Sequence, residues 1–142
     1  MFDPSGLDPV TTPGVSPNEN TTCCDTGQIA ICMKNPGNKD YKCKVVQDAM
    51  VTHEMSHVKD FTRLAPTICA KFQGKQSRTL AFTTWTEQIQ SELRAFNAQR
   101  DALNRAKDNG CLSPECKKEV DEWLNFITND AIPRVLSGKY GQ

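Results

Sequence analysis

The sequence His53-Glu54-Met55-Ser56-His57 constrains this chain more than any other stretch, because it contains both histidines of the 142-residue protein. On an α-helix, residues four positions apart lie on the same face, so the two imidazoles can reach one metal ion. Zinc binds imidazole nitrogen and, in a catalytic site, keeps one coordination position open for water. Glu54 is placed to accept a proton from that water. The pattern predicts a helical site for one zinc ion per chain, and a helix with two structural histidines is the alternative.

The residues around this pattern are typical of an amphipathic helix. Residues 46–64 contain neither proline nor glycine, and Pro66 follows them. Five side chains fall at helical spacing on one stripe: Met50, His53, His57, Phe61 and Leu64. This stripe predicts that both histidines face the interior of the protein.

The zinc site needs a third protein ligand, and with no further histidine that ligand must be a carboxylate or a cysteine. A second long helix is predicted over residues 84–108. Its apolar stripe consists of Trp85, Ile89, Leu93, Phe96 and Leu103. Glu92 lies on the same face of the helix as this stripe, which is expected to be buried. A buried carboxylate is costly unless it is paired or binds a metal. Glu92 is therefore the preferred ligand, Glu87 and Asp101 are weaker choices, and an exposed or salt-bridged Glu92 is the alternative.

These two helices together resemble the gluzincin pattern, in which an HExxH helix precedes a helix whose glutamate completes the zinc site. The resemblance covers residues 46–100 and includes the run from Glu92 to Ala95. It implies that His53, His57 and Glu92 are the zinc ligands and that Glu54 is the general base. It also implies that the small Ala95 lets the two helices approach closely.

The gluzincin resemblance further implies a mainly α fold of the zincin type, with α+β as the alternative, and a peptide or protein substrate. Asp60, one turn after His57, is a candidate to orient a ligand, although a solvent-facing Asp60 fits the sequence equally well. The chain departs from the family because it has no third histidine to stabilise an oxyanion. Tyr41, Tyr140 or an arginine remain open for that role.

Residues 1–20 have the composition of a linker, with four prolines among Gly, Ser, Thr and Asn. Within them, Asp3-Pro4-Ser5-Gly6-Leu7 resembles the DPxGL motif that closes the shell-forming core of rearrangement-hotspot (Rhs) proteins. Those proteins cut themselves just after the motif and leave a C-terminal toxin inside the shell. The resemblance implies that Asp3, Pro4, Gly6 and Leu7 are processing residues and that residues 21–142 form the toxin domain. An ordinary Asp-Pro turn is the alternative.

The Rhs resemblance also implies binding partners and a route of delivery into a target cell. The expected partners are the Rhs core shell, a cognate immunity protein and a substrate in a target cell. Delivery through a secretion apparatus, often type VI, would account for an N-terminus without the basic and apolar regions of a signal peptide. The formal net charge of zero indicates neither a nucleic acid nor an anionic membrane as partner. No apolar run of about 18 residues is present, so no helix is expected to insert into a membrane.

Seven cysteines bear on the compartment in which the protein folds: Cys23, Cys24, Cys32, Cys43, Cys69, Cys111 and Cys116. In an oxidising compartment three disulfides and one free thiol are expected, which favours the periplasm over the cytoplasm. Cys111 and Cys116 flank a predicted helix start and are a candidate pair. A structural zinc held by the first four cysteines is the disfavoured alternative, because adjacent Cys23 and Cys24 fit a tetrahedral site poorly.

The sequence also predicts a C-terminal helix and a short hairpin in the cysteine-rich N-terminal region. Ser113-Pro114-Glu115 supplies an N-cap, a first-position proline and an acidic first turn, and Pro133 marks a break after the helix. Residues 28–33 have strand character, and residues 41–46 either return as a second strand or lead into the helix. An edge strand beside the site would bind an extended substrate backbone.

Three functions are consistent with these features. The preferred one is a zinc metallopeptidase toxin that hydrolyses peptide bonds in proteins of a target cell. A zinc hydrolase of peptidoglycan peptides would use the same residues on another substrate. A non-catalytic, disulfide-rich binding module would use the two histidines only structurally.

Overall fold

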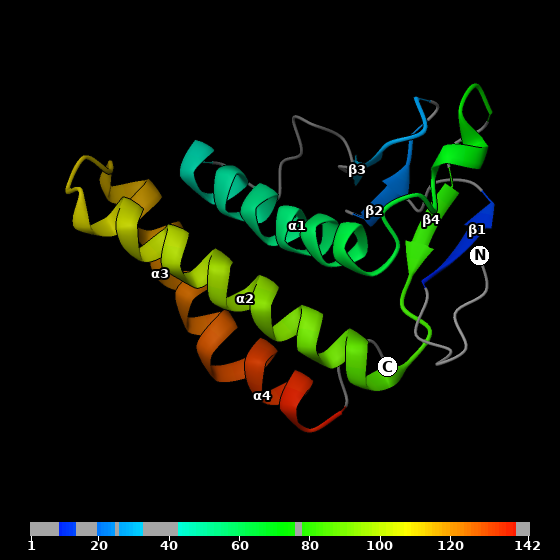
Figure 1. Ribbon diagram of the computed structural model, residues 1–142. Helices are drawn as coiled ribbons and strands as arrows, with labels where there is room; N and C mark the ends of the chain where they lie inside the picture. The colour runs from blue at the N-terminus through cyan, green and yellow to red at the C-terminus, as the bar shows by residue number, and fades with distance from the viewer. Residues whose placement is uncertain (1–8, 14–19, 25, 33–42, 76–77, 139–142) are drawn as a thin grey trace.

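The computed structural model describes residues 9–13, 20–24, 26–32, 43–75 and 78–138, and the architecture below refers to these. They form a mainly helical fold with one small sheet, as the sequence predicted (Figure 1). The elements in chain order are β1 (Val10–Pro13), β2 (Asn20–Cys23), β3 (Ile29–Cys32), α1 (Lys44–Leu64), η1 (Ala70–Phe72), β4 (Arg78–Ala81), α2 (Trp85–Asp108), α3 (Pro114–Phe126), η2 (Ile127–Ala131) and α4 (Ile132–Leu136).

The two long helices lie close to their predicted bounds. α1 begins two residues before the predicted start and ends at Leu64, just before Pro66. α2 begins after Thr84, whose side chain accepts a hydrogen bond from the backbone N–H of Glu87 and so satisfies one free amide of the first turn. α1 and α2 run in opposite directions and pack against each other along their length (Figure 1). The face that they share contains both histidines.

The helix after residue 113 starts as predicted. The side chain of Ser113 accepts a hydrogen bond from the backbone N–H of Cys116, and Pro114 occupies the first turn. The predicted break at Pro133 is wrong, because the chain continues through the π turn η2 into α4. In this wider turn the N–H of Ile132 bonds to the carbonyl of Ile127, which brings Pro133 into the first turn of α4. Proline has no backbone N–H to donate, and this is tolerated in the first turn of a helix.

One hydrophobic core lies between α1, α2 and the C-terminal helices, and a second lies between α1 and the sheet. The first consists of Cys43, Val46, Ala49, Phe96, Leu103, Val120, Ile127, Ala131 and Val135. The second consists of Cys23, Phe61, Cys69 and Leu80. Because α1 contributes to both cores, its two ends are held against different parts of the protein.

The sheet has the strand order β1-β4-β2-β3, and every neighbouring pair is antiparallel. The predicted strand in residues 28–33 is β3, which forms a hairpin with β2. Of the two alternatives given for residues 41–46, the described part, from Cys43 on, leads into the helix, because α1 begins at Lys44. Val10–Pro13, predicted as linker, instead forms edge strand β1 against β4. Its β-branched residues favour a strand, and Pro13 is tolerated at an edge.

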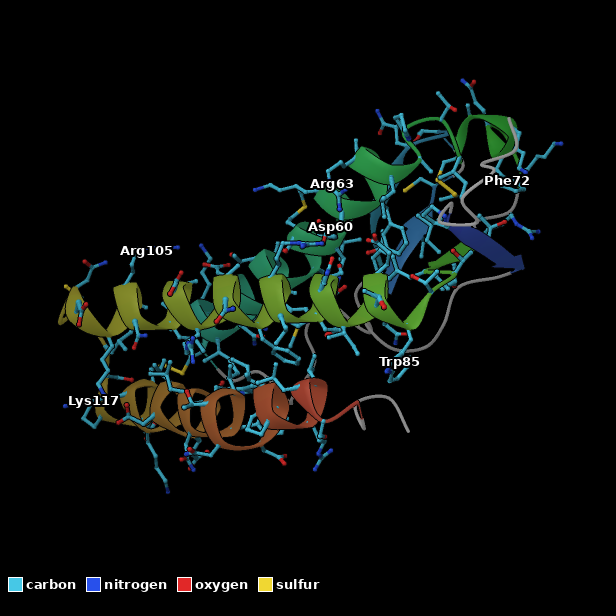
Figure 2. The ribbon with its side chains drawn as sticks, turned by 60° about the horizontal axis from the view of Figure 1, so that its bottom comes forward. Asp60, Arg63, Phe72, Trp85, Arg105 and Lys117 are labelled. Carbon is cyan, nitrogen blue, oxygen red and sulfur yellow. A yellow bond between two sulfur atoms is a disulfide. The ribbon has the colours of Figure 1, made fainter. Side chains whose placement is uncertain are left out.

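Two disulfides hold the ends of α1. Cys43, directly before the helix, is bonded to Cys116 of α3, and Cys69, after the helix, is bonded to Cys23 of β2 (Figure 2). The prediction of disulfides is therefore confirmed for these four cysteines. The expected number, three disulfides and one free thiol, is wrong, because Cys24 and Cys111 are both free. The alternative of a zinc held by the first four cysteines is wrong, because Cys23 and Cys43 belong to separate disulfides. The side chain of Cys32 lies outside the described part of the structure.

Cys24 and Cys111 are free thiols, and Cys111 is exposed. The predicted pair of Cys111 and Cys116 is wrong, because Cys116 packs against the first core, where it meets Cys43. The proposed processing residues Asp3, Pro4, Gly6 and Leu7 lie outside the described residues. Tyr41 and Tyr140 also lie outside them. Within the described ranges, none of the helices combines the length and the apolar character needed to span a membrane.

Candidate metal centre

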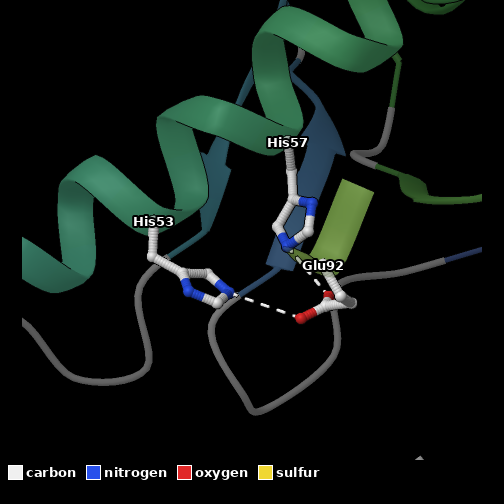
Figure 3. Close-up of side chains that lie close together, drawn as sticks. All are labelled: His53, His57 and Glu92. Carbon is white, nitrogen blue, oxygen red and sulfur yellow. Dashed lines mark ion pairs between the residues drawn. The ribbon is translucent and has the colours of Figure 1, made fainter. Parts of the chain in front are cut away.

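Three side chains predicted as zinc ligands come together between α1 and α2 (Figure 3). His53 and His57 project from one face of α1 with 5.0 Å between their ring centroids. Glu92 reaches them from α2, with its Oε1 2.9 Å from Nε2 of His57 and its Oε2 3.6 Å from Nε2 of His53. One ligand atom from each residue lies within 4.8 Å of the others, so the group could hold a metal ion.

The donor set and one unsatisfied atom fit a divalent cation. Two imidazole nitrogens and one carboxylate oxygen are the ligands that zinc accepts in open, three-residue sites. Oε2 of Glu92 is buried and has no hydrogen-bond partner among the described residues. A buried carboxylate oxygen without a partner is costly, and a cation between it and the two histidines would satisfy it.

Glu54 lies beside this group. Its side chain is buried, and its Oε1 is 4.0 Å from Nε2 of His53, on the side of the ring that faces Glu92. The weaker ligand candidates do not join the group. Asp101 is exposed, and Glu87 stands apart in the first turn of α2, although one of its oxygens is buried without a partner in the described structure.

Both imidazole rings are hydrogen-bonded on the side away from Glu92. Nδ1 of His53 lies 2.9 Å from Oε1 of Gln99. Nδ1 of His57 lies 2.8 Å from Oγ of Ser91, and this hydroxyl donates to Oδ2 of Asp60 at 2.6 Å. Asp60 is therefore linked to a predicted ligand through Ser91.

Asp60 is buried rather than solvent-facing, and two arginines surround it. Nε of Arg94 donates to both carboxylate oxygens at 3.1 and 3.2 Å. Arg63, one turn further along α1, brings its Nη2 to 3.8 Å from Oδ1 (Figure 2). These contacts fix the orientation of the carboxylate behind His57.

Aromatic rings pack against both histidines. Phe96 meets His53 edge to face at 4.6 Å between centroids. Phe82 lies 6.4 Å from His57 and stacks on Phe61 at 4.2 Å. This packing excludes water from the backs of the rings and restricts their rotation.

The two histidines differ in protonation. Burial lowers the pKa of His53 to about 4, and the charge of Glu92 offsets this only in part. Burial also lowers the pKa of His57, but the hydrogen bond and charge of Glu92, with the charges of Glu54 and Asp60, outweigh burial and raise that pKa above 6.5. Burial therefore favours the neutral ring of His53, whereas Glu92 favours the protonated ring of His57.

The sequence analysis missed Ser91 and Gln99, the two residues that contact Nδ1 of the histidines. Together with Ala95 they form a row at four-residue spacing on α2, and all three are completely buried. Both are polar side chains on a buried helix face, which is the same signal that identified Glu92 in the sequence.

Searches of protein-family models, of curated proteins and of solved structures found no match to this chain.

Proposed function

We propose that this protein is a zinc metallopeptidase with a zincin-like site. The observation that carries the proposal is the convergence of His53, His57 and Glu92 on one point, beside the buried carboxylate of Glu54. When bound there, zinc would supply Lewis acidity to a peptide carbonyl and would lower the pKa of a water molecule toward neutrality. A base next to such a site is the combination that amide hydrolysis requires.

Glu54 is the general base in this proposal. Its carboxylate accepts a proton from the attacking water and delivers the proton to the amine nitrogen that leaves. The carboxylate lies 4.0 Å from Nε2 of His53 and is therefore close to where the metal would bind. His53, His57 and Glu92 bind the metal and take no part in the proton transfer.

The sheet offers a binding surface for an extended substrate. β3 lies at an edge of the sheet that the described residues form, and it packs against α1. A peptide added along an edge strand gains backbone hydrogen bonds without any demand on its sequence. In this proposal the backbone of β3 aligns the substrate, and the side chains of β3 select the cleavage site.

We also propose that the domain is the C-terminal toxin of an Rhs effector, on the basis of Asp3-Pro4-Ser5-Gly6-Leu7. The shell of the parent protein would enclose it, and a cognate immunity protein would protect the producing cell. The two disulfides support action in an oxidising compartment, since thiols are kept reduced in the cytoplasm. That compartment makes the peptide cross-links of peptidoglycan the second candidate substrate.

Hydrolysis by wild type and Glu54→Gln, both loaded with zinc, tests the proposal. Glutamine keeps the volume of the side chain but cannot accept the proton, so we expect a loss of about 100-fold or more with zinc still bound. The exposed Glu122→Gln on α3 is the matched control. Substrates are an unfolded, dye-labelled protein and purified peptidoglycan peptides. Cleavage of the peptidoglycan peptides alone would favour the second candidate, and cleavage of neither by zinc-loaded wild type would contradict a peptidase.

A further inference from the structure

Two fully buried polar side chains on α2 call for a physical explanation. Ser91 and Gln99 are both 0% exposed. Each contacts Nδ1 of a different histidine, Ser91 that of His57 and Gln99 that of His53. Burying a polar side chain costs free energy that a leucine, methionine or alanine at the same position would not cost.

Gln99 is the clearer case because only one of the two polar groups of its side-chain amide has a hydrogen-bond partner in the described residues. Its Oε1 accepts a hydrogen bond from His53, but its buried Nε2 has no hydrogen-bond partner in the described parts of the chain. An amide with unmet donors lowers stability, so packing does not account for this residue. Its oxygen can only accept a hydrogen bond, which places the hydrogen of His53 on Nδ1 and leaves Nε2 with a free lone pair toward Glu92.

Ser91 acts on the second histidine by a different route. The hydroxyl has a single hydrogen, and it donates this hydrogen to Asp60 at 2.6 Å. The oxygen of Ser91 must therefore accept a hydrogen bond from Nδ1–H of His57 at 2.8 Å. The negative charge of Asp60 thus acts on His57 through one hydroxyl, and Arg94 holds that carboxylate in place.

We propose that Ser91 and Gln99 are positioning residues that hold both imidazoles with a hydrogen on Nδ1 and direct both Nε2 atoms at the metal. This inference rests on the proposed metal centre. One helix, α2, then supplies the third ligand and both orienting groups, with Ala95 between them. The packing register of α2 against α1 therefore determines the whole centre.

Gln99→Met separates positioning from a purely structural role. Methionine fills a similar volume without polar atoms, so the metal-free protein should unfold at the same or a higher urea concentration. Zinc affinity should fall about 10- to 100-fold, the usual effect of removing a group that orients a ligand. Gln99→Glu retains an acceptor oxygen and should keep most of the affinity. Gln90→Met, at an exposed position of α2, is the matched control.

The experiment is a zinc titration in competition with a chromogenic chelator, together with urea unfolding of each metal-free protein. Gln99→Met that binds zinc as tightly as wild type would overturn the positioning role. Wild type that binds no zinc would instead refute the metal centre itself, so the two failures are distinguishable. Nitrogen-15 spectra of metal-free wild type give a result that needs no variant: we expect His53 as the Nδ1–H tautomer, and the Nε2–H tautomer would contradict the role of Gln99.

Discussion

Nε2 of His57 lies 2.9 Å from Oε1 of Glu92, and this contact joins the two long helices at the centre of the site. At this distance a hydrogen must lie between the nitrogen and the oxygen, because two lone pairs would repel each other. The raised pKa of His57 has the same origin, since Glu92 favours the protonated ring. A metal ion bound at this site would take the place of that proton.

We therefore predict that zinc affinity depends on pH. Below the pKa of His57, zinc must displace one proton, so affinity should rise about tenfold for each pH unit and level off above that pKa. His53 does not contribute near neutrality, because its pKa is about 4. Chelator competition between about pH 5.5 and 8 measures the slope. An affinity that stays constant across this range would show that His57 carries no proton in the metal-free protein.

The lowered pKa of His53 predicts that acid destabilises the metal-free protein. The pKa is about 4 in the folded state and 6.5 in the unfolded state, so the unfolded state binds more protons between these values. Stability should fall as the pH drops from 6.5 toward 4. The raised pKa of His57 acts in the opposite direction: its contribution is complete below 6.5 and is lost as the pH rises through its folded value. Urea unfolding at both ends of the range, with a chelator present, measures the change.

The variant His53→Asn separates this effect from that of the carboxylates. It removes the group that the folded state keeps neutral, so it should lose less stability on acidification than wild type does. An equal loss in the two proteins would mean that His53 is not responsible for the acid sensitivity.

Ala95 is predicted to control the distance between α1 and α2. It is completely buried in the row between Ser91 and Gln99, the two residues that contact Nδ1 of the histidines. Ala95→Leu should push the helices apart, lower the free energy of unfolding by about 1–3 kcal/mol and weaken zinc binding. Asn104→Leu, at an exposed position of the same helix, should change neither quantity. Thermal unfolding and zinc titration of both variants test this, and wild-type zinc affinity in Ala95→Leu would contradict it.

The helices and the grouping of His53, His57 and Glu92 could be predicted because their signals are local. Ligands one turn apart on α1 and a carboxylate on the apolar side of α2 follow from helical spacing alone. Trp85 shows the limit of that argument, since it belongs to the predicted stripe but is 44% exposed at the first turn of α2. Spacing identifies a face of a helix, but it does not say how far the neighbouring elements cover it.

The strand order of the sheet and the pairing of the cysteines could not be predicted, because both depend on contacts between residues that are distant in sequence. Nothing in Val10–Pro13 indicates that it pairs with Arg78–Ala81. Cys116 is close in sequence to Cys111, but it is bonded to Cys43 across the core. Pairing of this kind depends on the packing of complete helices and not on spacing.

The Cys43–Cys116 disulfide is predicted to stabilise the start of α1. It joins residues 73 positions apart, and a loop of that length corresponds to about 4 kcal/mol in the chain-entropy description. Cys116→Ser should unfold at a clearly lower urea concentration than wild type. Cys111→Ser, which removes an exposed free thiol, should not. Equal stability of the two variants under oxidising conditions would argue against this bond.

Native mass spectrometry after zinc reconstitution tests most directly whether His53, His57 and Glu92 hold one zinc ion. We predict one zinc per chain in wild type and none retained in His53→Ala or Glu92→Ala, with both variants still folded by circular dichroism. Zinc retained by Glu92→Ala would leave the two histidines as ligands but exclude Glu92 as the third. Wild type without zinc after reconstitution would contradict the metal centre and the peptidase that depends on it.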